Sequence, residues 1–253
     1  MNGHGIAAIY KFEMARWGRT LWQSLITPVI TTALYFVVFG SALGGRMTAM
    51  EGISYGAFIV PGLTLLSVFM QSIFNASFGI YFPKFTGTIY ELLSAPISSF
   101  EAVIAYVGAA MTKSVILALV TLATALLFVP LQLDHPFWML FFLVGITAGF
   151  CLFGFAIGIW AQNFEQLQII PMMVITPLTF LGGAFYSINA LGEPWRTVTL
   201  FNPIVHLISG FRWSFYSVAD VPVWSSVAVM FGLNALCLAV IAWMFRSGYR
   251  LKQ

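Results

Sequence analysis

Long apolar runs separated by short polar segments follow one another along the chain. A helix that crosses a bilayer needs about 20 mostly apolar residues, and several runs reach that length. Prolines inside the first and fifth runs are tolerated because neighbouring helices satisfy the carbonyls that proline leaves free. The pattern predicts an all-α integral membrane protein with six spans, at Leu21–Leu43, Tyr55–Phe82, a third that ends at Val129, Phe137–Ala161, Leu167–Phe185 and Val223–Phe245.

The segment before the first span is amphipathic. Apolar residues recur there at helical spacing, and three cations remain for the opposite side and for lipid phosphates. Residues 1–20 are therefore predicted to form a helix in the cytoplasmic interface, with a short flexible tail as the alternative. The apolar positions are Ile6, Ile9, Tyr10, Met14 and Trp17, and the cations are Lys11, Arg16 and Arg19.

The connection between the second and third spans, residues 83–101, mixes polar and apolar residues. It is long enough for one surface helix that ends near Pro96. Such a helix would offer Ile89, Leu92 and Leu93 to the groove of a partner protein. The alternative is an ordinary turn between two helices.

The stretch between the fifth and sixth spans, residues 186–222, is longer than a usual connection. It is too polar to span and too apolar to lie free in water. We expect two short re-entrant helices that dip into the outer leaflet and are broken at Asn202-Pro203. Its aromatic residues would form an interfacial belt or line an exit for an amphipathic or glycosylated product, and the pattern leaves both open. They are Trp195, Phe201, Phe211, Trp213, Phe215 and Tyr216, with Arg196, His206 and Arg212 among them.

The fourth span carries glycines at helical spacing. Two pairs, Gly145 with Gly149 and Gly154 with Gly158, form small-xxx-small steps that let helix backbones approach closely. We interpret them as packing positions within the bundle rather than as a seam between two copies.

Composition supports the membrane assignment. Hydrophobic residues make up 60% of the 253 residues and charged residues only 8%, whereas soluble domains carry roughly 25% charged residues. The cations form no basic stripe, which argues against nucleic acid as a partner. Cys151 and Cys237 lie inside apolar runs and are expected to be small buried hydrophobes.

The distribution of cations predicts the orientation. Lysines and arginines near helix ends favour the cytoplasmic side, so both termini should be cytoplasmic. Seven cations fall on that side and three on the other: Lys11, Arg16, Arg19, Lys84, Arg246, Arg250 and Lys252 against Arg46, Arg196 and Arg212.

Lys113 is the one charge expected within a span. It lies roughly 24 Å from the outer end of the third span at about 1.5 Å per residue, near the cytoplasmic boundary of a core about 30 Å thick. Its side chain would reach the headgroups or take part in the substrate path.

Motifs for independent chemistry are missing from the sequence. It contains no phosphate-binding GxxxxGK[ST] and no HExxH, CxxC pair or GxSxG, and its three histidines are far apart. We therefore expect no cofactor, no metal and no enzymatic activity in this chain. Ion-coupled transporters place ionisable groups inside their spans, whereas the acidic residues Glu51, Glu91, Glu101, Asp134, Glu165, Glu193 and Asp220 fall in loops or near helix ends. The energy source should therefore lie on another subunit.

Three stretches resemble permeases of the ABC-2 type transporter family, and within it the YadH-like branch, over essentially the whole chain. The first is YGAFIVPG from Tyr55 to Gly62, and the second is ELLSAP from Glu91 to Pro96. The most specific is TPLTFLGGAFYS from Thr176 to Ser187, followed by LFNPI from Leu200 to Ile204 and GFR from Gly210 to Arg212.

The resemblance implies a single transmembrane domain over residues 1–253, in the inner (plasma) membrane of a bacterial cell. Two permease copies, expected as a homodimer, would bind two ABC ATPase subunits, which hold the ATP and Mg²⁺. Family members export lipids, free or lipid-linked glycans, and drugs, and the sequence does not select among these substrates. The first and fifth spans would line the dimer interface and the translocation path.

The resemblance also implies site residues. The connection between the second and third spans would be the coupling helix that contacts the ATPase, flanked by the N-terminal helix. Gly182 and Gly183 with Pro177 would be a deformable point, and Phe180 and Phe185 a hydrophobic gate. The expected sets are Lys84, Glu91, Leu92, Leu93, Pro96 and Arg16 for coupling; Pro177, Phe180, Gly182, Gly183, Phe185 and Tyr186 for the path; and Trp195, Arg196, Asn202, Pro203, His206 and Arg212 for the re-entrant segment.

Two other functions stay open. The chain would alternatively be a membrane scaffold or assembly factor that recruits an ATPase without passing substrate. A self-sufficient channel or ion-coupled transporter is disfavoured because no carboxylate is expected inside a span.

Overall fold

The computed structural model describes residues 2–41 and 52–250, and every element in them is helical. The helices are α1 Gly3–Arg19, α2 Leu21–Tyr35 with the π-helical turn η1 Phe36–Ser41, α3 Tyr55–Thr86, α4 Ile89–Ser94, α5 Ser99–Ala125, α6 Pro136–Trp160, α7 Phe164–Ile170 with the π-helical turn η2 Pro171–Ile175 and α8 Thr176–Leu181, the 3₁₀ turn η3 Ile188–Ala190, α9 Trp195–Leu200, α10 Pro203–Tyr216 and α11 Val223–Ser247.

Six helical segments of the described residues are long and apolar enough to cross a bilayer, so the six predicted spans are confirmed in number and order. They are Leu21–Val38, Tyr55–Thr86, Ser99–Ala125, Pro136–Trp160, Phe164–Leu181 and Val223–Ser247. The predicted end of the first span at Leu43, and the predicted positions of Arg46 and Lys252, lie outside the described residues.

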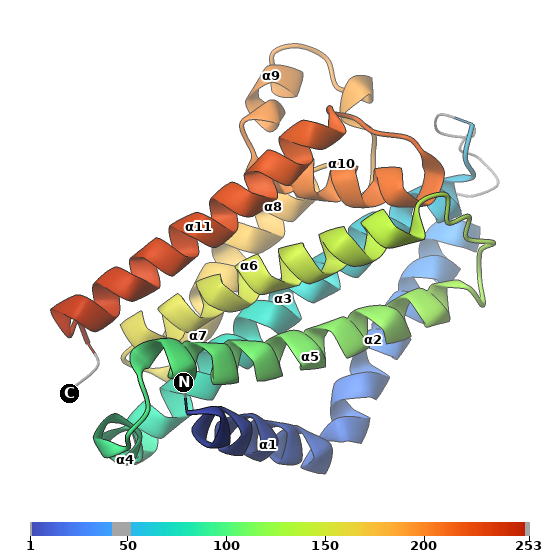
Figure 1. Ribbon diagram of the computed structural model, residues 1–253. Coiled ribbons are helices and arrows are strands. Elements are labelled where there is room, and N and C mark those ends of the chain that lie inside the picture. The colour runs from blue at the N-terminus through green and yellow to red at the C-terminus, as the bar shows by residue number, and fades with distance from the viewer. Residues whose placement is uncertain (1, 42–51, 251–253) are drawn as a thin grey trace.

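The long helices α3, α5, α6 and α11 lie side by side in one bundle (Figure 1). The N-terminus, α4 and the C-terminal end of α11 lie at one end of the bundle, and α9 and α10 lie toward the other (Figure 1). Helix α6 is central because it contacts α3, α5, α10 and α11.

Glycines of α6 permit this central position. A side chain at Gly154 or Gly158 would overlap the backbone of α3 at Ile73 or Ser77. Gly145 and Gly149 instead face side chains of α11. The glycines therefore serve packing within the bundle, as the sequence predicts.

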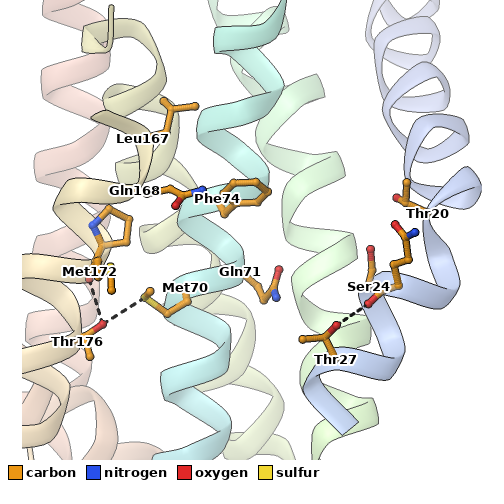
Figure 2. A pocket seen from close by; sticks show the side chains of 12 residues that line it. Thr20, Ser24, Thr27, Met70, Gln71, Phe74, Leu167, Gln168, Met172 and Thr176 are labelled. Atoms are coloured by element: carbon orange, nitrogen blue, oxygen red, sulfur yellow. Dashed lines mark hydrogen bonds between the residues drawn. The ribbon is translucent and has the colours of Figure 1, made fainter. Parts of the chain in front are cut away.

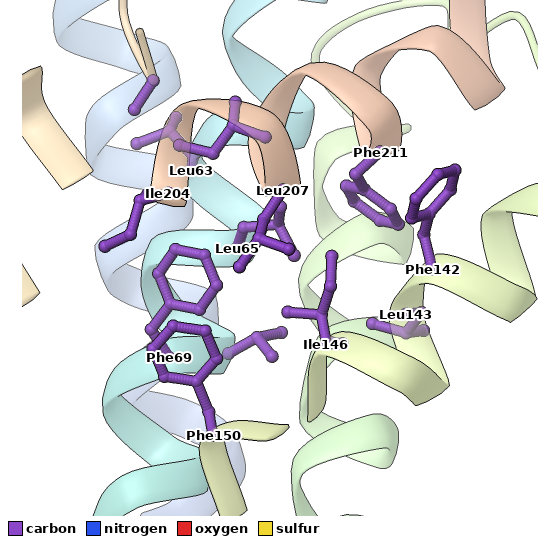
Figure 3. Close-up of a cluster of buried hydrophobic side chains, with 14 of the residues drawn as sticks. Leu63, Leu65, Phe69, Phe142, Leu143, Ile146, Phe150, Ile204, Leu207 and Phe211 are labelled. Atoms are coloured by element: carbon purple, nitrogen blue, oxygen red, sulfur yellow. The ribbon is translucent and has the colours of Figure 1, made fainter. Parts of the chain in front are cut away.

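Aliphatic and aromatic residues together fill the core between α3, α6 and α10 (Figure 3). Phe69 and Phe150 stack with ring centroids 4.2 Å apart. Phe211 and Phe215 of α10 are buried there, and the phenol of Tyr216 donates to the carbonyl oxygen of Ala57 at 3.0 Å. These three aromatics therefore belong to the core. For them, both expected roles, in an interfacial belt and in the lining of an exit, are wrong.

Helix α1 is separate from α2, and the chain turns between them at Thr20 (Figure 1). The predicted N-terminal helix is thus confirmed as a helix. It lies along the first half of α5, where Tyr10 Oη donates to Thr112 Oγ1 at 3.0 Å. The apolar stripe of α1, including Ile9, packs partly against the bundle.

The segment after α8 contains the two expected short helices, with the break at the predicted place. Asn202 caps α10 by accepting a hydrogen bond from the backbone N–H of Ile204. Pro203 follows at the first helical position, where its missing N–H costs nothing. The two cysteines, Cys151 and Cys237, are buried free thiols as expected.

Candidate translocation groove and coupling end

A groove runs between α2, α3 and the α7–α8 segment. Its largest cavity has a volume of about 570 Å³. Figure 2 shows Met70, Gln71 and Phe74 of α3 between the side chains of α2 and those of α7–α8. The hydroxyl of Thr176 donates to the carbonyl oxygen of Pro171 at 3.3 Å.

Two smaller cavities extend this groove in both directions. One of about 200 Å³ shares Thr27, Met70 and Gln71 with the first and reaches Tyr35. One of about 220 Å³ shares Thr20 and Gln71, among others, and continues toward α1. From Thr20 to Tyr35 the groove follows α2 for about 22 Å, which is most of a hydrocarbon core about 30 Å thick.

The walls of the groove combine polar and apolar side chains, although they belong to apolar spans. Hydroxyl and amide side chains line the main cavity: Thr20, Gln23, Ser24, Thr27, Gln71, Gln168 and Thr176. Helix α11 is also largely exposed, but its exposed positions from Phe231 to Trp243 are all apolar. Polar groups facing lipid tails are costly. The groove-lining sides of α2 and α7–α8, which mix polar and apolar residues, therefore suit an amphiphilic path or a protein contact, and the exposed side of α11 suits lipid.

The predicted gate residues lie at the far end of this groove. The rings of Phe180 and Phe185 stack with centroids 5.0 Å apart. Phe185 in turn lies 6.2 Å from the ring of Tyr35, which lines the groove. The structure thus brings together two aromatics predicted from sequence and a third that the prediction did not include.

The chain turns sharply just after α8. Gly183 has a positive φ of 76°, which favours glycine, and a side chain at Gly62 of α3 would overlap the backbone of Ala184. Pro177 is exposed within α8. Tyr186 Oη donates to the carbonyl of Leu181 at 3.1 Å; burial, followed by the charge of Asp220, raises the pKa of this phenol.

Arg212 holds that turn from inside the protein. Its side chain is 0% exposed, and Nη1 lies 2.7 Å from Oδ2 of Asp220. It also donates to the carbonyl oxygen of Gly183, and its guanidinium lies 3.9 Å from the centroid of the Phe58 ring. Asp220 additionally accepts from the hydroxyl of Ser187 at 2.6 Å. Arg212 is therefore buried with a carboxylate, and its expected place in the re-entrant segment on the outer side stays a prediction.

The other residues of the predicted re-entrant set take several positions. Asn202 donates to the carbonyl of Leu178 at 2.6 Å and so ties α10 to α8. His206 contacts the hydroxyl of Ser225 at 3.0 Å. Trp195, Arg196 and Pro203 are exposed.

Helix α4 forms the predicted helix between the second and third spans, but it presents a different face. Ile89 is buried in the bundle and Leu92 is half-buried against it. The prediction that Ile89 is offered to a partner is therefore wrong, because its side chain completes the core of this chain. The exposed residues are Tyr90, Glu91, Ser94 and Pro96, and nothing is described for the side chain of Leu93.

Lys84 belongs to the interior rather than to the surface of the coupling segment. Its ammonium group donates to the carbonyl oxygens of Ile159 at 2.5 Å and Ala161 at 3.1 Å. These carbonyls lie at the C-terminal end of α6, where helix carbonyls lack partners and a cation is favourable. Lys84 therefore joins the end of α3 to the end of α6.

The N-terminus of α1 rests on the connection between α4 and α5. The Asn2 side-chain amide donates to the Pro96 carbonyl at 3.3 Å, and Gly5 lies against the side chain of Ile97. A capping box of Ser98 and Glu101 starts α5. Motion of α4 would therefore move α1 and α5 together.

Lys113 is buried inside the bundle instead of exposed at its surface. It is 3% exposed, and its ammonium group lies 2.9 Å from Oε2 of Glu13. The same oxygen lies 2.6 Å from Nη2 of Arg16. The prediction that the side chain of Lys113 extends to the surface is therefore wrong. Arg16 likewise faces Glu13 instead of the opposite side of α1. Both results have one cause, because the buried carboxylate of Glu13 attracts both cations.

Two acidic residues carry contacts that the sequence did not reveal. Glu13 is in none of the predicted site sets, and Asp220 is expected in a loop or near a helix end. The i, i+3 spacing of Glu13 and Arg16 on a helix was the one available signal. Lys113 is 100 residues from Glu13 in the sequence, so only the fold brings this pair together. Arg212 is 8 residues from Asp220.

Among the described residues, six helices long and apolar enough to cross a bilayer define a multi-pass membrane protein. Residues 4–216 match the ABC-2 type transporter family, and the chain belongs to that family.

Relatives agree with this assignment. The chain is 37% identical over 225 residues to the inner membrane transport permease YadH of Escherichia coli K12, which covers 89% of this chain and 88% of the relative. It is 22% identical over 212 residues to nodulation protein J of Rhizobium leguminosarum bv. viciae, covering 81% of this chain and 80% of that protein. Nodulation protein J of Rhizobium meliloti is 23% identical over 217 residues, covering 83% and 81%.

Proposed function

We propose that this chain is the permease subunit of an ATP-driven ABC exporter that moves an amphiphilic substrate through the groove beside α2. The substrate classes consistent with the family are lipids, free or lipid-linked glycans, and drug-like molecules. The observation that carries the proposal is the groove itself, which is lined by hydroxyl, amide and apolar side chains, extends from Thr20 to Tyr35 and meets Phe180 and Phe185 at its far end.

A second copy of the chain would complete the path. The faces of α2 and α7–α8 that line the groove are exposed in the single chain and carry hydroxyl and amide groups. Two such faces opposed across a twofold axis would enclose an amphiphilic passage and cover their polar groups from lipid. We therefore propose a homodimer, bound to two ATPase subunits that supply ATP and Mg²⁺.

Family membership implies an ABC ATPase partner, and the end of the bundle with α4 is the proposed contact. Tyr90, Glu91 and Pro96 are exposed there, and Arg246 and Arg250 follow at the end of α11. This end carries the larger number of cations, which supports a cytoplasmic placement of both termini. The YadH relative is an inner membrane permease, which supports the same membrane for this chain, with α1 in its cytoplasmic interface and α9–α10 dipping into its outer leaflet.

The mechanism follows from these contacts. Closure of the ATPases on ATP would push α4, and the Asn2 and Lys84 contacts would transmit the displacement to α1, α5 and α6. The groove walls would then shift relative to α3. Phe180 and Phe185 would keep the outer end dry when the path is closed, as hydrophobic constrictions do.

The proposal is tested by reconstituting the chain with its ATPase in vesicles. Release of substrate that needs ATP, and that stops when the ATPase carries an inactivating substitution, is the expected result. A scaffold would bind the ATPase but leave substrate in place. Substrate movement with no ATPase present would contradict the proposal.

Charge reversal tests the coupling assignment. Glu91→Lys should reduce ATP-driven export roughly tenfold or more if this carboxylate makes a charged contact with the ATPase. Glu165→Lys, an exposed carboxylate in the first turn of α7, is the matched control. Normal export and normal ATPase stimulation in Glu91→Lys would remove α4 from the coupling role.

A further inference from the structure

The cluster of Glu13, Arg16 and Lys113 has an uneven charge. One carboxylate oxygen, Oε2 of Glu13, lies within 2.6 Å of Arg16 and 2.9 Å of Lys113. Two cations and one anion leave a net charge of plus one. The side chains of Glu13 and Lys113 are buried and that of Arg16 is 26% exposed. Charge in a poorly hydrated site is costly unless it is paired, so the cluster is suited to a second anion that approaches from the exposed side of Arg16.

The cluster also has hydrogen-bonding groups that are not used. Among the described residues, Nη1 of Arg16 and Oε1 of Glu13 have no hydrogen-bond partner although both atoms are buried. The guanidinium of Arg16 lies over the Phe78 ring, 5.1 Å from its centroid. An arginine nitrogen held in this way is a donor suited to a phosphate oxygen.

A cavity lies beside these charges. It has a volume of about 220 Å³ and is lined by Arg16 and Lys113 together with Thr20, Ser24, Gln71 and Asn75, among others. The nearby hydroxyls and amides add further donors. Its residues Thr20, Ser24, Gln71 and Phe74 also line the main cavity of the groove, so the two are continuous.

The position of the cavity suits a headgroup. Thr20 and Ser24 lie at the very start of the first span, where the hydrocarbon core gives way to the interface. The main cavity then continues deeper beside Met70, Met172 and Phe74, which are apolar. A molecule placed here would have a polar end at the charges and an apolar end along α3.

We propose, as an extension of the proposed exporter function, that Arg16 and Lys113 bind the phosphate headgroup of an anionic amphiphile at the inner end of the groove. Glu13 holds the two cations in position and limits their net charge to one. The recognised chemistry is a phosphate ester next to an apolar tail, in a membrane phospholipid or in a transported substrate.

The test measures lipid binding to the purified full-length chain by native mass spectrometry. The probes are phosphatidylglycerol and phosphatidylcholine with the same acyl chains. We expect the wild-type chain to prefer phosphatidylglycerol. Arg16→Gln and Lys113→Gln should each weaken phosphatidylglycerol binding by roughly tenfold.

Glu13→Gln is the decisive variant because it removes the negative charge but keeps an amide oxygen. It should strengthen phosphatidylglycerol binding several-fold, whereas a variant that merely loosened the fold would weaken it. Lys11→Gln, an exposed cation on the same helix that does not line the cavity, should leave binding unchanged.

Two results would overturn the proposal: equal binding of the two lipids by the wild type, or a shift of Arg16→Gln and Glu13→Gln in the same direction. If phosphatidylglycerol binding changes as expected in both variants, inorganic phosphate is added as a competitor. Displacement of phosphatidylglycerol by phosphate would show that the phosphate alone is recognised. No displacement would show that headgroup and tail are recognised together. The assay needs neither ATP nor an ATPase. Loss of transport with lipid preference intact would therefore refute the exporter function only, and loss of preference with transport intact would refute the headgroup site only.

Discussion

Replacing Gly154 by alanine tests the contact between α3 and α6 that supports the floor of the groove. A Cβ atom at this position would lie 2.7 Å from Cα of Ile73 and 2.9 Å from its carbonyl carbon. Carbon atoms in ordinary contact are about 3.5–4.0 Å apart. The two helices must therefore separate by about 1 Å, since the atoms that collide belong to the backbone of α3 and not to a flexible side chain.

The size of the effect follows from two opposing terms. Overpacking of a well-packed interior costs about 1–3 kcal/mol, and separation of the helices would also disturb the Phe69–Phe150 stack. Alanine in place of glycine stabilises a helix by about 1 kcal/mol. These two terms leave a net cost of about 0–2 kcal/mol, and a weakened Phe69–Phe150 stack adds to it. We therefore expect Gly154→Ala to lower the free energy of unfolding by about 1–2 kcal/mol.

The assay is thermal unfolding of the purified chain in one detergent, compared with Gly232→Ala. Gly232 lies on α11, and a Cβ atom there would meet nothing within 4 Å. The control should unfold at or above the wild-type temperature, and Gly154→Ala several degrees lower, at about 2–4 °C per kcal/mol. Equal behaviour of the two variants would refute the claim that α3 and α6 pack through bare backbone at this position.

Three further substitutions test the groove and its supports. Arg212→Met leaves Asp220 buried without its cation and should destabilise the chain by about 3–5 kcal/mol; Arg212→Met with Asp220→Asn should cost less than the sum of the single changes, and additivity would show that the pair is not coupled. Lys84→Met leaves two carbonyls at the end of α6 without a donor, so the unfolding temperature should fall by the equivalent of about 1.5–3 kcal/mol, and an unchanged temperature would contradict this role. Phe180→Ser should allow substrate or water to leak through reconstituted vesicles without ATP, and vesicles as tight as the wild type would exclude Phe180 as a gate.

Much of the fold is predictable because the bilayer imposes strict rules on a sequence. A span must be long and apolar, so each of the six helices follows from one apolar run of the sequence. Examples are the runs that begin near Leu21, Tyr55 and Phe137. The glycines of α6 and the break before Pro203 are likewise local signals, since each reflects backbone geometry that few other residues permit. The ELLSAP and TPLTFLGGAFYS stretches placed the candidate coupling and gate residues by resemblance, and their roles stay predictions.

The sequence by itself determined that this protein dissolves in lipid as a six-span bundle, because hydrophobicity and helical period are properties of single segments. Only the tertiary structure decided which side of each helix is used. Ile89 turned inward, Lys113 met Glu13, and Arg212 met Asp220. These three outcomes have one physical reason. A buried charge or apolar side chain finds its partner on the segment that packs against it, and the pattern of a single helix does not reveal which segment that is.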